Sequence, residues 1–360
     1  MILKTYQAYI IKNYLTIFLK ISLIFLSLVM ILNVFEEINF FKDSEVSIAI
    51  ILTLTIINAP SILYEIFPFI FLITSQFFFI KIMDQKELSV YKNFGIENIK
   101  ILKIIVLSSL IIGILIATIF YNFSAKLKFL YYNLKNDYSS DNKYLAVITH
   151  NGIWIKDELN NSIYIVNAQK ISENFLINVD VSEFDKNFEL IRNINAKKID
   201  ISNKKWSIKN ATTLNKNNEI KENIDLFINS NFDLEKINSL YSNLSSLTIW
   251  ELYKLKKDYV DLGYSSIEIN TQIQKIISFP LYVALMTIIA TIVMLNIKPN
   301  KSKVFYLVLG IALSVIIFYL SNFINILGKN ERLPMILAIW LPLIILSIFN
   351  MIGMVRLNEK

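Results

Sequence analysis

Six apolar stretches of about 20 residues constrain most strongly what this 360-residue chain can fold into. A helix of that length crosses the ~30 Å hydrocarbon core of a bilayer, because a helix rises about 1.5 Å per residue. Hydrophobic residues make up 54% of the chain, more than an ordinary soluble domain contains. The sequence therefore predicts an α-helical polytopic membrane protein. Its six transmembrane helices are expected near residues 13–35, 46–80, 101–123, 273–295, 304–327 and 334–355.

A polar middle segment, residues 124–270, divides the six spans into two sets of three. It contains 19 Lys and Arg residues and 19 Asp and Glu residues, so its charges balance. The formal charge of +7 on the whole chain therefore lies in residues 1–123 and 271–360. We expect three parts in chain order: helices 1–3, an inserted domain and helices 4–6.

The distribution of basic residues predicts the orientation in the membrane. The short flanks on one side of the spans carry 12 Lys and Arg residues, whereas those on the other side carry only Lys42, Lys329 and Arg332. Because basic flanks stay in the cytoplasm, both chain termini are expected there. The inserted domain is then outside, in the periplasm if the cell is Gram-negative.

Alternating apolar and polar residues in the first two thirds of the insert predict short antiparallel strands. Phe175, Ile177, Val179 and Val181 are expected on one face, and the pairs 199/201 and 206/208 repeat the pattern. Turns are expected at 160–161, 185–187 and 202–204. The pattern favours an antiparallel β-sandwich or a jellyroll-like roll. Such a domain either caps the membrane part or offers a cleft and edge strands to partners.

The end of the insert changes to a helical period. Thr248 and Glu251 have the spacing of a capping box. Ile249, Leu252, Leu255 and Tyr259 then lie on one face, and Gly263 can end the helix. We expect a helix over about 248–263 that tethers the insert to the fourth span.

A second short amphipathic helix is expected at about 84–95, between the second and third spans. Leu88, Tyr91 and Phe94 are three residues apart, Asp84 and Glu87 lie at the N-terminal end, and Gly95 can cap the C-terminal end. By itself this pattern predicts only a helix that lies on the headgroups.

Two charged residues fall inside the apolar spans. Lys20 is close enough to the end of its span to extend to the interface, although a buried substrate contact is the alternative. Glu65, between Pro60 and Pro68, is either a functional carboxylate or an interfacial one beside a helix break.

The residue inventory argues against chemistry on this chain. There is no Cys, and His150 is the single histidine, which excludes thiolate nucleophiles and multi-His metal sites. No glycine has the context of a phosphate-binding G-x-x-x-x-G-K-[ST] loop. We expect no enzyme, no bound cofactor or metal and no nucleic-acid partner; any ATP must be bound by another subunit.

An ordered set of motifs resembles the LptF/LptG permease family of the lipopolysaccharide exporter, and the resemblance covers essentially the whole chain. The motifs are residues 60–68, 87–95, 151–157, 247–252 with Gly263, and 275–280. The run Gly-Ile-Trp-Ile-Lys-Asp at 152–157 looks more like LptG than LptF. The resemblance implies a permease subunit of an ABC exporter in the inner membrane of a Gram-negative bacterium. Such a subunit extracts lipopolysaccharide and passes it to a periplasmic bridge.

The resemblance also implies partners and sites. A cytoplasmic LptB-like ATPase dimer would use ATP, an LptF-like paralogue would pair with this chain, and LptA/LptC-like proteins would form the bridge and a single-span partner. Spans one and five of each permease would line a cavity for one lipopolysaccharide. The helix at 84–95 looks like the coupling helix that docks on the ATPase, with Glu87, Leu88, Tyr91, Phe94 and Gly95 as its contacts.

The chain departs from the family where lipid phosphates are expected to bind. LptG-type proteins carry basic residues where the first span leaves the membrane, but here the matching positions are Asn33, Asn39 and Phe40. After the third span, Lys135 matches one family arginine and Tyr132 replaces another. The resemblance therefore predicts weaker or rearranged phosphate contacts, made by Lys42, Lys126, Lys128 and Lys135.

Two rival functions remain at this point. An exporter permease of the macrolide-exporter type usually has four spans and a larger insert after the first, which the six spans and central insert argue against. A membrane-anchored scaffold whose β domain binds a partner, without transport, needs neither a coupling helix nor a lipid cavity. Retention of an ATPase separates the scaffold from the transporter.

Overall fold

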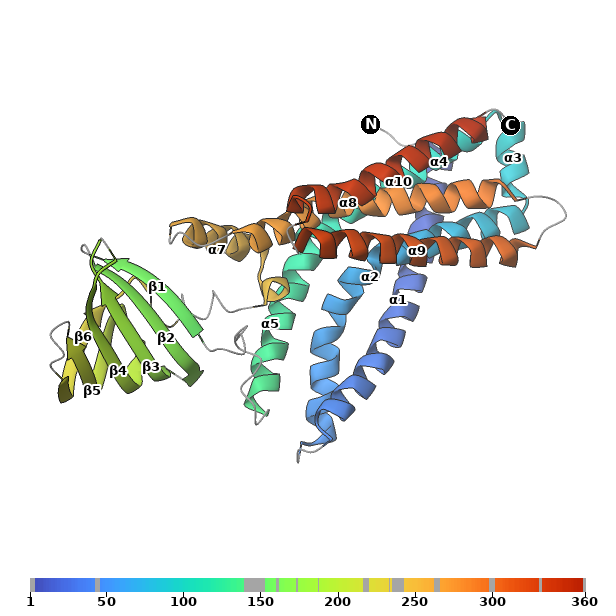
Figure 1. Cartoon of the computed structure of the whole chain (residues 1–360). Helices are drawn as coiled ribbons and strands as arrows, with labels where there is room; N and C mark the ends of the chain where they lie inside the picture. The colour runs from blue at the N-terminus through green and yellow to red at the C-terminus, as the bar shows by residue number, and fades with distance from the viewer. Residues whose placement is uncertain are drawn as a thin grey trace. The chain divides into compact units, whose positions relative to one another are not determined.

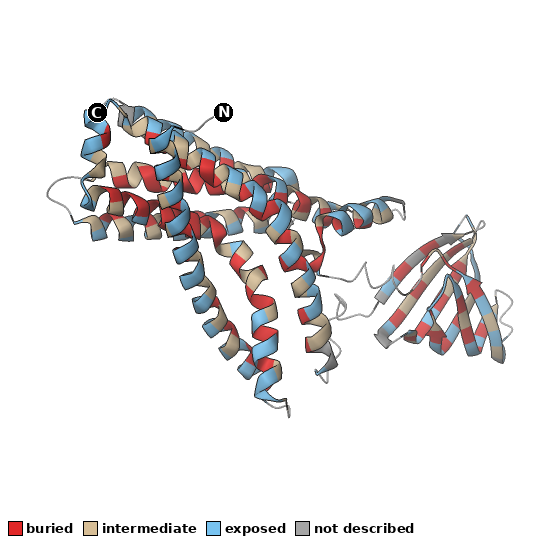
Figure 2. Cartoon of the chain, turned by 180° about the vertical axis from the view of Figure 1, so that it is seen from behind, coloured by how far each residue is buried: buried red, intermediate tan, exposed pale blue. Residues whose placement is uncertain are grey.

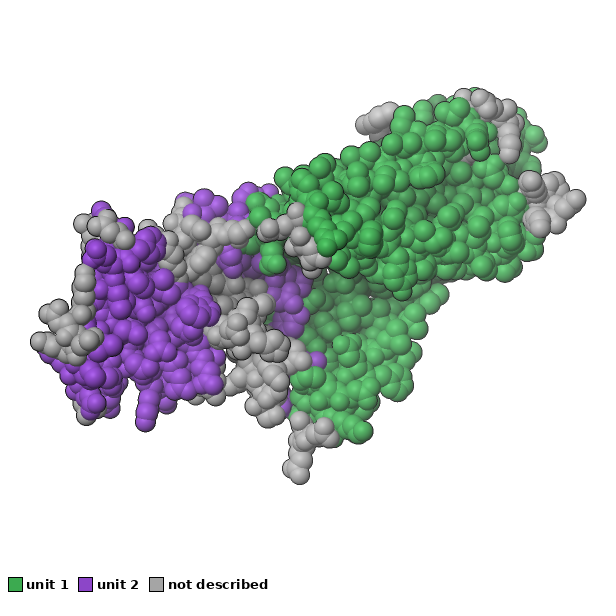
Figure 3. Space-filling view, viewed as in Figure 1, with its two compact units in different colours: residues 1–131, 267–360 green, residues 132–266 purple. Residues whose placement is uncertain are grey.

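The chain forms two compact units, which are described separately. One unit contains residues 1–131 and 267–360, and the other contains residues 132–266 (Figure 3). The sequence predicted these boundaries at 123/124 and 270/271. The computed structural model describes residues 4–42, 46–138, 153–159, 162–172, 174–186, 188–215, 220–232, 234, 243–261, 266–297, 302–329 and 332–358. His150, the turn at 160–161, Gly263 and the basic loop at 298–301 lie outside the described residues.

The first unit contains six helices that are long and apolar enough to cross a membrane, as predicted. The third is a continuous helical stretch of three pieces, and a short helix, α3, precedes it (Figure 1). The elements are α1 (Thr5–Phe40), α2 (Ile48–Asp84), α3 (Glu87–Asn93), α4 (Asn98–Leu115), η1 (Ile116–Phe120), α5 (Tyr121–Asp137), α8 (Ile267–Leu295), α9 (Lys303–Lys329) and α10 (Met335–Asn358).

Helices α2 and α8 form the centre of this unit. The spans differ in the share of residues that are buried in their most apolar part. This share is 67% in α2 and 61% in α8, but only 11% in α1 and 22% in α9. Buried residues accordingly concentrate where the helices pack together (Figure 2). Helices α1 and α9 therefore keep broad apolar faces available for lipid or for other proteins.

Proline and glycine shape the two central helices. Pro60 and Pro68 lie inside α2, which changes direction along its length (Figure 1). The physical reason is that proline removes a backbone donor and its ring displaces the preceding turn. Pro280 of α8 packs against Gly113 of α4, where an added Cβ would lie 3.1 Å from the proline Cα. Glycine thus permits the close approach of α4 and α8.

The third span contains a π-helical segment, η1, which the sequence did not predict. A π-turn holds an extra residue, so it rotates the side chains that follow it relative to those before it. Tyr121 and Ala125, the first core residues of α5, are buried after this rotation. The segment therefore sets which face of α5 packs inward.

The second unit is built on one six-stranded antiparallel sheet. Its strands follow chain order, so no crossover connects the strands in the described ranges. This arrangement favours the predicted roll over the two-sheet sandwich. The strands are β1 (Ile153–Leu159), β2 (Ser162–Ser172), β3 (Phe175–Phe184), β4 (Leu190–Asp200), β5 (Lys205–Asn215) and β6 (Ile220–Asn229).

The core of this sheet confirms part of the predicted pattern and corrects another part. Ile199, Ile201, Trp206 and Ile208 are buried in one cluster, as expected. In β3, however, Leu176 is in the core, and Phe175 and Ile177 are only half-buried.

The correction has a backbone cause. Asn178 adopts a positive φ of 50°, and the burial phase changes there, between Leu176 and Val179. Asparagine tolerates this left-handed conformation better than most residues. Strict alternation fails at such a residue because the pleat is locally reversed.

Asp157 connects the two edge strands of the sheet, β1 and β6, through hydrogen bonds. It lies on β1, and its carboxylate accepts hydrogen bonds from the Ser230 hydroxyl at 2.7 Å and from the Asn231 main-chain N–H at 2.9 Å. The Asn231 side-chain amide donates a third bond at 2.8 Å. Because residues 230–231 follow β6 directly, the sheet curves until its edges meet here. The sheet is therefore a roll.

Helix α7 (Ile249–Asp261) matches the predicted tethering helix in position. The main-chain N–H and the hydroxyl of Thr248 both donate to the Glu251 carboxylate at 2.7 Å, which confirms the capping interaction. Leu252 and Leu255 are buried on the predicted face.

Candidate functional site

Helix α3 is shorter than predicted and is set off sharply from α2. Asp84 is the last residue of α2, and Lys86 at φ 57° breaks the helical path before Glu87. At the other end, Gly95 at φ 72° follows the helix as expected. The main-chain N–H of Ile96 bonds to the Tyr91 carbonyl and that of Gly95 to the Lys92 carbonyl, which defines a Schellman cap.

The side chains of α3 point in two directions. Tyr91 is buried, whereas Phe94 is 80% exposed and Val90 is 50% exposed. The three-residue spacing of Leu88, Tyr91 and Phe94 therefore does not place them on one common face, because Phe94 already lies at the C-cap. The sequence analysis did not identify Val90, although its spacing of four from Phe94 was a usable signal.

The Glu87 side chain points toward helix α1. Its Oε1 accepts a 2.7 Å hydrogen bond from the hydroxyl of Tyr9 on α1, and its Oε2 is buried without a hydrogen-bond partner among the residues that the structure describes. Burial raises the pKa of the Tyr91 hydroxyl to about 12, with the charges of Glu87 and then Tyr9 adding to the rise. Tyr91 thus stays neutral near pH 7. The Glu87–Tyr9 bond therefore fastens α3 to α1, and the Tyr91 side chain is buried.

The end of α2 next to α3 is joined to two other spans by polar contacts. Lys81 donates to Asn13 of α1 at 2.9 Å, and Asp84 forms an ion pair with Lys303 of α9. Deeper in the bundle, the Gln76 amide donates to the main-chain carbonyl of Tyr306 on α9 at 3.0 Å. Gln76 is fully buried. Helix α2 is therefore connected to both α1 and α9 close to α3.

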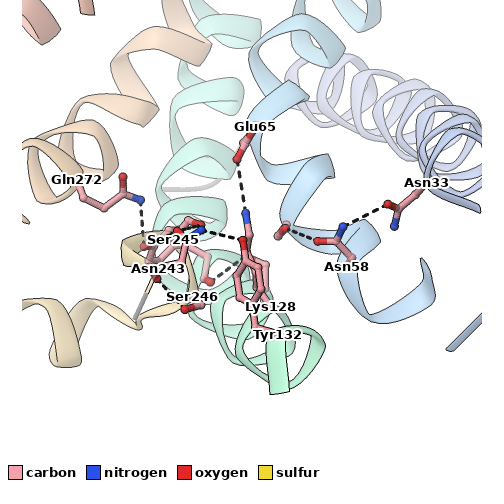
Figure 4. Close-up of polar contacts among 12 residues, drawn as sticks. Asn33, Asn58, Glu65, Lys128, Tyr132, Asn243, Ser245, Ser246 and Gln272 are labelled. Carbon is pink, nitrogen blue, oxygen red and sulfur yellow. Dashed lines mark hydrogen bonds and ion pairs between the residues drawn. The ribbon is translucent and has the colours of Figure 1, made fainter. Parts of the chain in front are cut away.

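Helices α1 and α2 are also joined by a buried amide network (Figure 4). Asn58 of α2 donates to the Asn33 side-chain carbonyl at 3.3 Å, and Asn33 donates to the Thr55 main-chain carbonyl at 3.3 Å. Ser61 donates to Asn58. Asn33, which the resemblance matched to a basic lipid-contact position, is buried and joins two helices.

The four lysines predicted to contact lipid have different surroundings. Lys42 and Lys126 are exposed, and Lys135 is buried. Lys128 of α5 lies with its ammonium group 4.0 Å from the carboxylate of Glu65 on α2 (Figure 4). The structure therefore joins Glu65, a residue the sequence singled out, to one of the predicted lysines. Lys20 is exposed on α1.

Aromatic side chains pack between α2, α5 and α8 next to Glu65. The Tyr64 ring stacks on Phe279 of α8 with centroids 4.7 Å apart and meets Tyr121 edge-on at 5.1 Å. Gln272 donates to the Tyr121 hydroxyl at 3.3 Å. Tyrosines with polar partners are typical of the membrane–water interface. Tyr64 and Glu65 are adjacent on α2, so these aromatic contacts lie beside the Glu65–Lys128 pair.

Six apolar spans in two sets of three, with an antiparallel β domain inserted between them, define a class: multi-pass permease subunits with an extramembrane domain. Residues 8–356 match the family model described as lipopolysaccharide export system permease LptF/LptG. The chain belongs to this family, which supplies the permease part of an ABC transporter and not its ATPase. A search of curated proteins finds no match.

Proposed function

We propose that this chain is the LptG-like subunit through which an ABC ATPase drives lipopolysaccharide out of the inner membrane. The proposal rests on how α3 is attached to the neighbouring helices. Its inner side is held by Tyr91 and by Glu87, while Val90 and Phe94 face outward. A short helix held in this way transmits a push as a rigid body. The LptG-like run at 152–157 supports the choice between the two paralogues.

The exposed face of α3 fits a groove on an LptB-like ATPase dimer, which binds and hydrolyses the ATP. Val90 and Phe94 are one helical turn apart, the spacing at which a helix inserts two anchors into a groove. Gly95 and Leu88 flank these anchors. Glu87 acts behind them, by orienting α3 through Tyr9.

Movement of α3 reaches the spans through the end of α2. Asn13 and Lys303 are the first contacts of α2 with α1 and α9, and the Gln76–Tyr306 contact extends the connection into the bilayer. Helices α1 and α9 have the most exposed apolar surface. They face the LptF-like paralogue and the lipid cavity in this proposal.

Lipid phosphates bind near the outer ends of the spans. Lys42, Lys126, Lys128 and Lys135 supply the positive charge, and exposed Lys42 and Lys126 make the first contacts. Basic residues near the ends of neighbouring spans attract an anionic headgroup without any cofactor on this chain.

The β domain is the exit of the lipid path. The edges of β1 and β6 beyond the Asp157 contact present backbone groups that pair with the sheets of LptA/LptC-like proteins. Both termini lie in the cytoplasm and the β domain in the periplasm, in agreement with the distribution of basic residues.

Docking of the ATPase tests this function. The complex of this chain, its paralogue and the ATPase is purified with Glu87→Lys or Phe94→Ser, and ATPase retention and lipopolysaccharide-stimulated hydrolysis are measured. Loss of a large apolar anchor commonly costs about 2 kcal/mol or more, so retention should fall at least about tenfold. Ser89→Ala, an exposed change on the same helix, is the control and should behave as wild type.

Wild-type retention and stimulation in both variants would contradict the proposed docking face. A folded wild-type chain that retains no ATPase at all would favour a non-transporting scaffold instead.

A further inference from the structure

The contact between Glu65 and Lys128 is asymmetric. The Lys128 side chain is 13% exposed and that of Glu65 is 66% exposed. The carboxylate therefore lies on the open side of the pair, and an anion that approaches the ammonium group meets Glu65 first.

The contact is also loose. Its 4.0 Å separation exceeds hydrogen-bond distance, so the two charges attract without a directional bond. Because the Glu65 side chain is 66% exposed, solvent screens the attraction, so the contact adds little to stability. The carboxylate can thus leave Lys128 at little cost to the fold.

We infer that Glu65 is an intramolecular competitor for Lys128, which lets lipid phosphate monoesters bind there and excludes phosphodiester lipids. This inference rests on the proposed lipid-contact role of Lys128 and adds the selectivity of the site.

The charge of the incoming group decides the competition. A phosphodiester, as in ordinary phospholipids, carries one negative charge, the same as the Glu65 carboxylate. Glu65 is attached to the neighbouring helix, so its effective concentration at Lys128 is high and a monoanion gains nothing by replacing it. A phosphate monoester carries about −1.5 to −2 charges near pH 7 and three acceptor oxygens. It attracts the ammonium group more strongly and can displace the carboxylate.

A pair of lipids with the same acyl chains tests the inference. Phosphatidic acid carries a monoester phosphate and phosphatidylglycerol a diester. The assembled transporter is placed in nanodiscs of zwitterionic phosphatidylcholine that contain either lipid, and the lipid retained is measured by native mass spectrometry. Wild type should prefer phosphatidic acid, and Glu65→Gln should reduce that preference about threefold to tenfold through increased phosphatidylglycerol binding.

Lys128→Gln should weaken phosphatidic acid binding, and Glu65→Gln combined with Lys128→Gln should match Lys128→Gln alone. Lys103→Gln is the matched control, because Lys103 is an exposed lysine in the same helical span outside the proposed lipid contacts, and it should keep the wild-type preference. Excess inorganic phosphate should not displace the lipid, since the acyl chains hold the headgroup at the site.

An unchanged preference in Glu65→Gln, unchanged binding in Lys128→Gln, or displacement by inorganic phosphate would overturn the inference. Thermal unfolding of each variant identifies any that has lost its fold, and Glu65→Ala then replaces Glu65→Gln with the same loss of preference expected. The lipid preference is measured without ATP. Failure of lipopolysaccharide to stimulate hydrolysis in wild type would therefore count against the proposed transport function alone.

Discussion

The side-chain amide of Gln76 on α2 occupies the space that a side chain at Gly310 on α9 would fill. From there it donates to the main-chain carbonyls of Tyr306 and Leu307, at 3.0 and 3.4 Å. A glutamine that is fully buried among apolar helices needs such partners, because lipid offers none. The absence of a side chain at position 310 is what lets the amide reach the α9 backbone.

Gly310→Val should loosen α9 from α2. The added side chain overlaps the Gln76 amide, and overpacking of this kind typically costs about 1–3 kcal/mol. We expect a lower thermal midpoint of the purified complex and weaker coupling of ATP hydrolysis to lipid release. Leu320→Val, which introduces the same residue at an exposed site of α9, is the control. Equal midpoints for the two variants would contradict this role of Gly310.

Tyr9→Phe should free α3 on the side that faces α1. The change removes the hydroxyl that donates to Glu87, a charge-assisted bond with a contribution of about 1.5–3 kcal/mol. Because the chain has no Cys, a spin label can be placed by Asn93→Cys alone. Label mobility should rise in Tyr9→Phe and stay unchanged in Tyr6→Phe. A rise in both variants, or in neither, would show that the Tyr9–Glu87 bond does not restrain α3.

Asp157→Ala should open the β roll at its edges. Ser230 and Asn231 lose the acceptor of three hydrogen bonds in a buried position, which should cost about 2–4 kcal/mol. Urea unfolding, followed by the fluorescence of the buried Trp206, should shift to lower urea concentration. Glu222→Ala, at an exposed position of β6, should leave the midpoint in place. A midpoint for Asp157→Ala equal to that of Glu222→Ala would argue that the edges are held elsewhere.

Ser202→Ala should change stability in a pH-dependent way. The hydroxyl and main-chain N–H of Ser202 hold the pKa of the Asp200 carboxyl below its usual value. A carboxyl whose pKa is lowered by folding contributes stability above the unfolded pKa of about 3.9, and loses it as pH falls through the folded pKa. The stability difference between wild type and Ser202→Ala should therefore be present at pH 6 and shrink below about pH 4. A difference that is constant between pH 6 and pH 3 would rule out Asp200 as its source.

Local features of the chain were predictable where one short segment determines them. The Gly95 cap follows from the conformational freedom of glycine, and the Thr248–Glu251 capping interaction from two residues three apart. Lys86 and Asn178 were not predicted. Each adopts a positive φ that sequence pattern does not reveal, and each shifts the face of the residues that follow.

The candidate site was predictable residue by residue but not as a set of contacts. The sequence singled out Glu65 and Lys128 separately, and it assigned Glu87 to the surface that meets the ATPase. Their actual neighbours, each other in one case and Tyr9 in the other, are more than 60 residues away in the chain. Hydrophobic periodicity describes neighbours within one helix or strand, so it cannot identify contacts between residues so far apart in the chain.

The sequence by itself determined the six spans, their division by a β domain and the family, because hydrophobic length and strand alternation are properties of single segments. The tertiary structure alone decided which charged and amide groups meet: Gln76 with the α9 backbone, Asp84 with Lys303, and Glu65 with Lys128. Gln76 needs a partner because burying a polar group without one is costly, whereas the two ion pairs form because charges on different helices come close. In each case the partner is set by how distant helices pack.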